Sequence, residues 1–273
     1  MKSLFSILFL TFSVVLTAQK EIKKQPFTLG EIVEVSSVQL GEKRTLNVYL
    51  PEGYADNDTA RYPVIYLLDG SADEDFIHIV GITQYLSFSW IGILPKSIVV
   101  GIATVDRRRD FTFPTTIEKD KKDYPTSGHS DKFIAFIEQD LLPFVNKNYR
   151  TTATKTLMGQ SLGGLLATEV LFKKPSLFNN YVIVSPSLWW DKESLFVRYP
   201  SVPTTHFATK TNVYVAVGKE GKIMEGDARQ LVKILKKVES HQVKIGFDFF
   251  PKENHATIYH RAVYGAFEFL KGK

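Results

Sequence analysis

Apolar residues along the chain alternate between two patterns, and together these patterns predict an α/β protein. Short, nearly continuous apolar runs are typical of strands buried on both faces of a parallel sheet. Strands are predicted at 63–69, 97–105, 155–158, 181–185, 213–217 and 243–250. Segments with helical spacing of apolar residues lie at 130–146, 162–172, 228–238 and 258–270. This order predicts a mostly parallel central sheet with helices on both faces.

The pattern before residue 63 is different and predicts an antiparallel hairpin in front of that sheet. Partial alternation and β-branched residues indicate strands at 31–40 and 45–50, with Gly41-Glu42 as the turn between them. Within the helix at 130–146, Pro143 is expected to kink or end it. In folds of this kind ligands bind at the carboxyl ends of the strands. Any chemistry is therefore expected in the loops that follow strands.

The first residues resemble a targeting segment. Lys2 precedes an uncharged, largely apolar run at 4–16, and these 13 residues are too few for a membrane-spanning helix, which needs about 20. The run ends in small residues at Ala18, which predicts a secretory signal peptide, residues 1–18, cleaved after Ala18. We expect export to a periplasm or beyond, a loose polar segment at 19–29, and a single domain over 30–273.

Composition narrows the classes of function. The formal net charge of +5 over 273 residues is mild, so it does not indicate a nucleic-acid partner, which needs a concentrated basic face. The chain has no cysteine, which excludes disulfides, thiolate zinc sites and cysteine nucleophiles.

A nucleophile motif lies between a predicted strand and a predicted helix. Residues 159–163 form G-x-S-x-G. In this context the motif places a serine at a sharp turn, which lifts the hydroxyl of Ser161 out of the sheet. The N–H of Leu162, at the start of the helix, then points to where an oxyanion would form.

A serine nucleophile needs a base and an acid that reach the same edge of the sheet. Of the six histidines, His255 lies in the loop between the last strand and the last helix. Glu220 follows the strand at 213–217, and the chain order Ser161, Glu220, His255 is that of α/β-hydrolases. Glu225 is a rival in the same loop. Asp227, a second rival, is better interpreted as the N-cap of the next helix.

Further residues after strands are candidates for the pocket. A second oxyanion donor is expected from the loop at 69–72, where Gly70 allows close approach and the N–H of Ser71 or Ala72 could donate. Other candidates for contact with substrate, from three further loops, are Trp189, Trp190, Arg107, Arg108 and His129. At least one of the tryptophans could instead pack into the core. The run 107–109 could form internal ion pairs with Asp106 and Asp110, or an electropositive rim that attracts anionic substrates.

At this point the chain resembles the α/β-hydrolases of the Putative esterase family, which includes esterase D-type enzymes, feruloyl esterases and ferric-siderophore esterases. The resemblance covers about residues 30–272 and rests on several segments: VIYLLDG (64–70), DRRRDFTFP (106–114), NYRT (148–151), GQSLGG (159–164), SPSLWWD (185–191), VGKEG (217–221) and ENH (253–255). It implies the α/β-hydrolase fold and a serine carboxylesterase, with Ser161 and His255 in the catalytic roles. The tryptophan and arginine segments are most similar to the siderophore-esterase branch. In this family the position of the acid varies, so Glu220 is carried over less directly.

These observations predict an exported serine hydrolase of carboxylic esters, acting on a small-molecule ester without a metal or cofactor. A siderophore trilactone would suit the arginine run, and a feruloyl or acetyl ester on polysaccharide would suit the tryptophans. An acyltransferase on the same fold and a non-catalytic binding protein are the alternatives.

Overall fold

The computed structural model describes residues 23–54, 59–202, 207 and 209–272. The expected signal peptide at 1–18 lies outside these residues. Of the segment expected to be loose, residues 23–29 contain neither helix nor strand. In the described part of the chain, no helix combines the length and apolar character that crossing a membrane requires.

One eight-stranded sheet forms the centre, in the order β1-β2-β4-β3-β5-β6-β7-β8. Its strands are β1 (Glu31–Ser37), β2 (Glu42–Tyr49), β3 (Tyr62–Leu67), β4 (Ile98–Ile102), β5 (Thr151–Gln160), β6 (Asn180–Val184), β7 (Thr211–Gly218) and β8 (Val243–Phe250). β1 and β2 form the expected hairpin, and β2 also runs antiparallel to β4. The pairings from β4 through β3 to β8 are all parallel. The predicted α/β fold with a mostly parallel sheet is confirmed.

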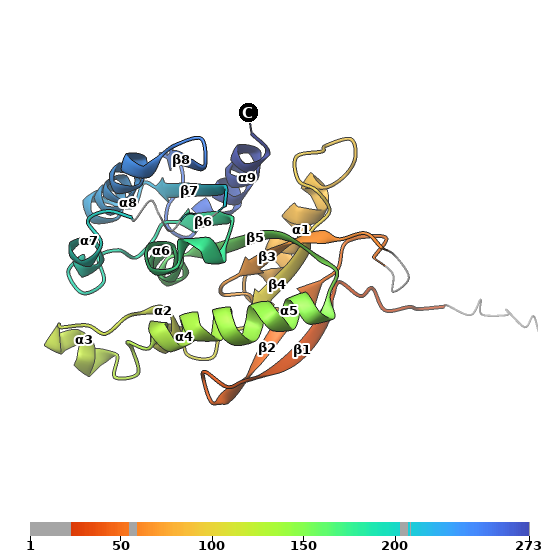
Figure 1. Ribbon diagram of the computed structural model, residues 1–273, viewed down its shortest axis with the longest axis horizontal. Coiled ribbons are helices and arrows are strands. Elements are labelled where there is room, and N and C mark those ends of the chain that lie inside the picture. Colours follow the sequence, from red (N-terminus) through yellow and green to blue (C-terminus); the bar gives the residue numbers. More distant parts are fainter. Residues whose placement is uncertain (1–22, 55–58, 203–206, 208, 273) are drawn as a thin grey trace, which may run out of the picture.

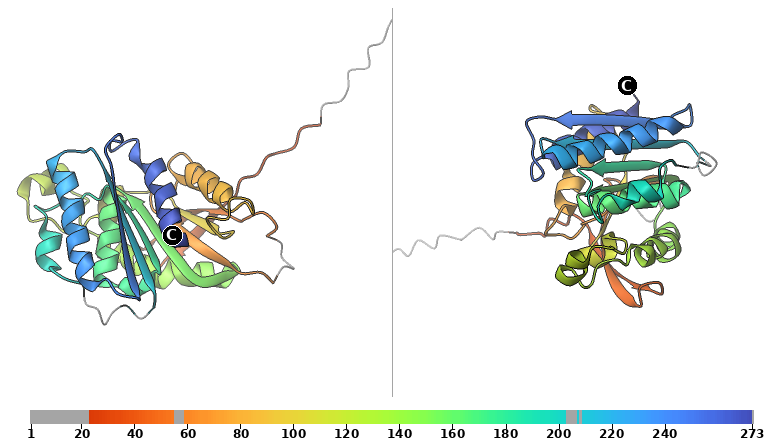
Figure 2. Two further views of the ribbon diagram at one scale, coloured as in Figure 1. Left: turned by 90° about the horizontal axis from the view of Figure 1, so that it is seen from above. Right: turned by 90° about the vertical axis from the view of Figure 1, so that its left-hand side faces the viewer.

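Helices cover both faces of the sheet, as Figures 1 and 2 show. α1 (Phe76–Leu86) and α9 (Ile258–Lys271) pack on one face, where their apolar side chains form one of the two core clusters. The other face carries α2 (Arg107–Phe111), α4 (Ser130–Phe136), α5 (Leu142–Asn148), α6 (Leu162–Lys173) and α8 (Lys222–Leu235). Two short helices, α3 (Glu118–Asp123) and α7 (Ser194–Arg198), lie in the connections. Because both faces are buried, the strands contain the continuous apolar runs seen in the sequence.

Two predicted helix features need correction in detail. The helix expected at 130–146 does not end at Pro143 but is interrupted just before it: a π-helical turn, Ile137–Leu141, separates α4 from α5, and Pro143 lies in the first turn of α5. A proline is tolerated there because the first N–H groups of a helix need no partner within it. The second feature is the start of α8, which lies at Lys222, so Asp227 is inside the helix rather than at its N-cap. Apolar burial in α8 begins only at Ala228, which is why the hydrophobic pattern starts late.

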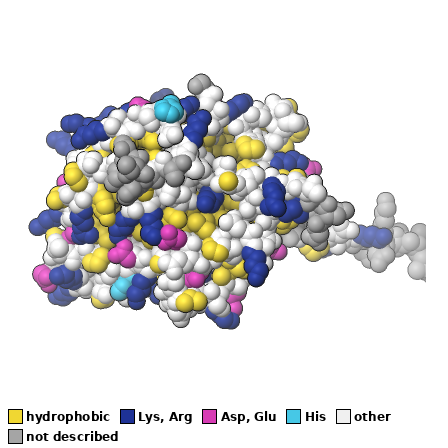
Figure 3. All heavy atoms as spheres, in the orientation of Figure 1, with side chains coloured by type: hydrophobic (Ala, Val, Ile, Leu, Met, Phe, Trp, Pro, Cys, Tyr) yellow, Lys and Arg dark blue, Asp and Glu magenta, His cyan; other side chains and the backbone are white. Residues whose placement is uncertain are grey.

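Charged side chains are dispersed over the surface. On the face drawn in Figure 3, Lys and Arg side chains are spread widely, with Asp and Glu between them. This face does not present the concentrated basic surface that nucleic-acid binding requires.

Candidate active site

Ser161 lies at a tight bend between β5 and α6, with φ 59° and ψ −120°. A residue other than glycine adopts such angles only where the surrounding structure holds it. The glycines of the motif permit the bend, since a Cβ on Gly159 would lie 2.5 Å from the carbonyl oxygen of Gly163. The Ser161 N–H donates to the Val184 carbonyl at 3.0 Å, which ties the bend to β6. The sequence motif therefore adopts the geometry of a nucleophile elbow.

His255 and Glu220 form a close pair at the same edge of the sheet. His255 lies in the turn between β8 and α9, and its Nδ1 is 2.5 Å from Glu220 Oε2. The Glu220 side chain is only 3% exposed, whereas that of His255 is 47% exposed. Glu220 Oε1 accepts hydrogen bonds from Ser185 Oγ at 2.5 Å and from the Gly218 N–H at 2.9 Å. Every oxygen of this carboxylate thus has a defined donor.

These donors decide the protonation state of Glu220. Burial raises the pKa of the Glu220 carboxyl, but the hydrogen bonds from His255, Ser185 and Gly218 outweigh burial and leave the pKa below its ordinary value. The carboxylate is therefore ionised at neutral pH. An ionised acceptor at Nδ1 favours the imidazole tautomer with its proton on Nδ1, which leaves Nε2 free to accept one.

Ser161 and His255 together line two hollows of different character. One, of about 630 Å³, is also lined by Trp189, Met224 and Lys219; we call it the apolar hollow. The other, of about 370 Å³, is also lined by charged and amide side chains, namely Asp69, Glu74, Asp75, Arg107 and Gln160; we call it the acidic hollow. Within the described part of the chain, Ser161 Oγ is hydrogen-bonded to Ser187 Oγ, at 3.2 Å, rather than to the imidazole. A substrate in this cleft would meet the nucleophile and the base together.

The candidate oxyanion donors differ in whether their N–H groups already have a hydrogen-bond acceptor. Leu162 is the first residue of α6, where N–H groups have no partner within the helix. The Gly70 N–H donates to the Ile102 carbonyl at 3.0 Å, so Gly70 is not itself a free donor, and its role is the close approach that the sequence predicted. Close approach to β4 explains this, since a Cβ on Gly70 would lie 2.4 Å from Gly101. The Ser71 N–H faces the carboxylate of Glu74, at 3.3 Å.

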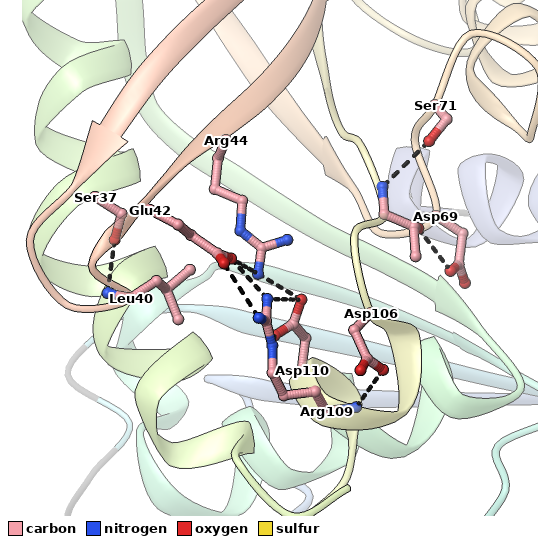
Figure 4. A network of polar contacts seen from close by, with 10 residues as sticks. Ser37, Leu40, Glu42, Arg44, Asp69, Ser71, Asp106, Arg109 and Asp110 are labelled. Carbon is pink, nitrogen blue, oxygen red and sulfur yellow. Dashed lines mark hydrogen bonds and ion pairs between the residues drawn. The ribbon is translucent and has the colours of Figure 1, made fainter. Parts of the chain in front are cut away.

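The arginine run forms internal ion pairs. Arg107 binds Asp69 through Nε and Nη2, at 2.7 and 2.9 Å. Arg109 binds Glu42 and Asp110, and buried Arg44 joins the same network, which Figure 4 shows.

Of the two alternatives for the run, Arg107 and Arg109 thus form the internal ion pairs, although Arg107 pairs with Asp69 rather than with Asp106. The guanidinium carbon of Arg108 lies 4.1 Å from the ring centre of Tyr124, a cation–π contact. Arg107 is the member of the run that lines the cleft.

The remaining pocket candidates separate clearly. Trp189 is 42% exposed and lines the apolar hollow. Trp190 is 1% exposed, and its Nε1 donates to the Phe113 carbonyl at 2.8 Å, so its expected contact with substrate is wrong and it belongs to the core. His129 lies at the N-cap of α4, its N–H bonded to the Arg109 carbonyl, and it does not line either hollow.

Three site residues were not predicted. Ser185 holds Glu220, Ser187 contacts the nucleophile, and the side-chain amide of Gln160 donates to the His255 carbonyl. Ser185 and Ser187 follow β6 at the active edge, and this position is a signal that the sequence contains. For Gln160 the signal is only its place beside Ser161, since its partner lies 95 residues away.

The fold and the cleft define an enzyme of the α/β-hydrolase class, and comparison with known proteins agrees. Residues 37–262 match the family described as Putative esterase, and the chain belongs to this family. It is 30% identical over 240 residues to the ferri-bacillibactin esterase BesA of Bacillus subtilis, and this alignment covers 80% of this chain and 81% of that protein. It is 26% identical over 188 residues to the apo-salmochelin esterase of Escherichia coli O6:H1, which covers 66% of this chain and 58% of that protein.

A solved structure shares the fold. The IroE-like serine hydrolase from Shewanella oneidensis superposes with a TM-score of 0.81 at 28% identity, covering 88% of this chain and 79% of that one. The chain is thus an esterase of the serine hydrolase type.

Proposed function

We propose that this esterase hydrolyses the ester bonds of a siderophore, of the trilactone type, with Ser161, His255 and Glu220 as its catalytic triad. The observation that carries the triad is the cleft lined by both Ser161 and His255, whose imidazole contacts a buried carboxylate through Nδ1. The siderophore substrate is supported by the relatives, one named for a ferri-siderophore and another for an apo-siderophore.

In the proposed reaction, Ser161 Oγ turns from Ser187 toward His255 and attacks the ester carbonyl carbon. His255 Nε2 takes the proton of the hydroxyl and then donates it to the leaving alcohol, which forms an acyl-enzyme. Water, deprotonated by the same imidazole, releases the carboxylic acid and returns the proton to Ser161. Glu220 keeps the imidazole in the required tautomer and stabilises its charged form.

The oxyanion of the tetrahedral intermediate needs preorganised donors. The Leu162 N–H is one, at the start of α6. The Ser71 N–H becomes the second when a substrate carbonyl displaces the Glu74 carboxylate, which contacts it at 3.3 Å in the free enzyme. Because an oxyanion and a carboxylate cannot share this donor, substrate binding must move Glu74.

We also propose that the protein is exported, because Lys2, the uncharged run at 4–16 and the small residues ending at Ala18 form a signal-peptide pattern. Fractionation of cells that express the full chain, with N-terminal sequencing of the recovered protein, tests this proposal. A cytoplasmic protein that retains its first 18 residues would contradict it.

The substrate is tested with a panel of esters: a short-chain aryl ester, a catecholate trilactone with and without iron, and a feruloyl sugar. Ser161→Ala should lower kcat by a factor on the order of 10⁶, and a fluorophosphonate should label Ser161 in the unaltered protein. Trilactone turnover at least tenfold above that of the feruloyl sugar supports the proposal. Preference for the feruloyl sugar, acyl transfer to an added alcohol in place of hydrolysis, or no labelling of Ser161 would contradict it.

A further inference from the structure

Gln160, the residue before Ser161, forms hydrogen bonds through both its main-chain carbonyl and its side-chain amide. Its main-chain carbonyl accepts a hydrogen bond from Arg107 Nη2 at 3.2 Å. Its side-chain Nε2 donates to the main-chain carbonyl of His255 at 2.5 Å. The last residue of β5 is thereby joined directly to the turn that contains the proposed catalytic base.

This bond matters because strand pairing does not fix the separation of the two reacting side chains. Ser161 follows β5 and His255 follows β8, and β6 and β7 lie between these strands in the sheet. The turn at 251–257 is held mainly by contacts within itself and by the Lys219 N–H, which donates to the Glu253 carbonyl at 2.8 Å. The His255 side chain is about half exposed, so packing does not immobilise it.

The hydrogen bond to Glu220 does not by itself fix the distance between the His255 imidazole and Ser161. Its bond to Nδ1 sets the tautomer of the imidazole and the direction of one ring edge. How near Nε2 comes to Ser161 then depends on where the His255 backbone lies, and the Gln160 amide holds that backbone through its carbonyl. Together the two hydrogen bonds restrain the imidazole relative to the nucleophile at its ring and at its backbone.

We propose that Gln160 is a positioning residue, which holds the backbone of His255 against the nucleophile elbow so that the imidazole stays within reach of Ser161. This inference rests on the proposed function, since it assigns His255 as the base. A misplacement of about 1 Å at a reacting group can cost on the order of 10²-fold in rate, so a hydrogen bond of this kind has a measurable effect on kcat.

The test compares Gln160→Met, which keeps the length of the side chain but has no N–H donor, with Gln160→His, which returns a donor at a similar reach. Gln230→Met, at an exposed position on α8, is the matched control. The measurements are kcat and KM on a small aryl ester and the rate at which a fluorophosphonate reacts with Ser161. This rate reports attack by Ser161 without substrate subsites.

We expect Gln160→Met to lower both kcat and the labelling rate by about 10- to 100-fold, with KM within about twofold of the unaltered value. Gln160→His should recover both rates to within about threefold, and Gln230→Met should change neither. Recovery by an N–H donor would separate positioning from a general effect on folding.

Three results would overturn the inference. The first is an unchanged kcat and labelling rate in Gln160→Met. The second is a raised KM with unchanged labelling, because the side chain would then contact substrate. The third is a Gln160→His variant as slow as Gln160→Met. Ser161→Ala, measured in parallel, separates these outcomes from failure of the proposed function: if it retains activity, the proposed nucleophile itself is wrong.

Discussion

Replacing Glu220 by Gln keeps the shape of the side chain but should change the tautomer of the His255 imidazole. Ser185 Oγ and the Gly218 N–H both face the Oε1 position, at 2.5 and 2.9 Å. The amide oxygen of Gln is expected at that position, because an NH₂ group there would face the Gly218 N–H, which can only donate. The NH₂ group then faces His255 Nδ1, which can only accept. The imidazole proton moves to Nε2, the atom that takes the proton of Ser161 in the proposed mechanism.

The magnitude follows from this tautomer change. The equivalent exchange of an acid for its amide in a serine protease triad lowers kcat by about 10⁴ while the geometry is kept. We therefore expect Glu220→Gln to lower kcat by about 10³- to 10⁴-fold, equivalent to about 4 to 5.5 kcal/mol in the barrier. KM should change little, since the Glu220 side chain is only 3% exposed.

The assay is the steady-state hydrolysis of a short-chain aryl ester, with the rate of fluorophosphonate labelling measured in parallel. Glu225→Gln is the matched control, because the Oε1 of Glu225 accepts from the N–H groups of Glu220 and Gly221, at 3.2 and 3.1 Å. A Gln oxygen accepts the same two bonds, so this variant should keep its activity within about twofold. If Glu220→Gln retains more than about a tenth of kcat, the buried acid does not set the tautomer and this reasoning fails.

Three further predictions follow from contacts of single side chains. Trp189→Ala should lower kcat/KM for aromatic relative to acetyl esters by about tenfold, with an unchanged Tm. Trp190→Ala should lose about 3 to 5 kcal/mol of stability. The reverse pattern, measured by kinetics and thermal unfolding, would refute the assignment of Trp189 to the cleft and Trp190 to the core. Ser187→Ala removes a hydrogen bond that Ser161 must break before reaction, so kcat/KM for a small ester should rise by up to about fivefold, and a loss of more than tenfold would show that Ser187 acts in the transition state. Burial, with a smaller contribution from Glu193, raises the pKa of Asp227 to about 6. Between about pH 4 and 6 the folded state therefore keeps a proton on Asp227 that the unfolded state has lost. The free energy of unfolding consequently falls as pH rises through this window. Asp227→Asn should therefore stabilise the protein by about 1 to 2 kcal/mol at pH 7.5 and by almost nothing below pH 4, and an equal shift in Tm at both pH values would contradict the reasoning.

The strands and the elbow could be predicted because their signals are local. A parallel strand covered on both faces is a continuous apolar run, so β3, β4, β6 and β7 are evident in the sequence. α1 is not among the predicted elements: its sequence, FIHIVGITQYL, is rich in β-branched residues and contains a glycine, so its propensity does not favour a helix. Burial of Phe76, Ile79 and Val80 against the sheet stabilises it as a helix in the fold.

The order of strands and helices is sufficient to predict that the main site residues lie at one edge of the sheet. Ser161, Glu220 and His255 each follow a different parallel strand, and the carboxyl ends of such strands meet at one edge. The order of elements therefore sufficed to place Glu220 near His255. It did not place Ser187 beside Ser161, or Gln160 beside His255, because those contacts depend on how the loops pack.

The arginine run shows why charge along a sequence is a poor guide to charge at a site. Asp106 and Asp110 are the nearest acids in sequence, but Arg107 pairs with Asp69, 38 residues away, and Arg109 pairs with Glu42, 67 residues away, as well as with Asp110. The guanidinium groups of Arg107 and Arg109 thus each meet a carboxylate from another strand or loop, which offsets part of the long-range field that three adjacent arginines would produce. The acidic hollow also contains Glu74 and Asp75, and burial, with the nearby carboxylates of Asp69 and Glu74, raises the pKa of Asp75 to about 6. In the proposed function, the Trp189 side of the cleft therefore supplies the apolar contacts to the ester, and Arg107, paired with Asp69, is the member of the arginine run that lines the cleft.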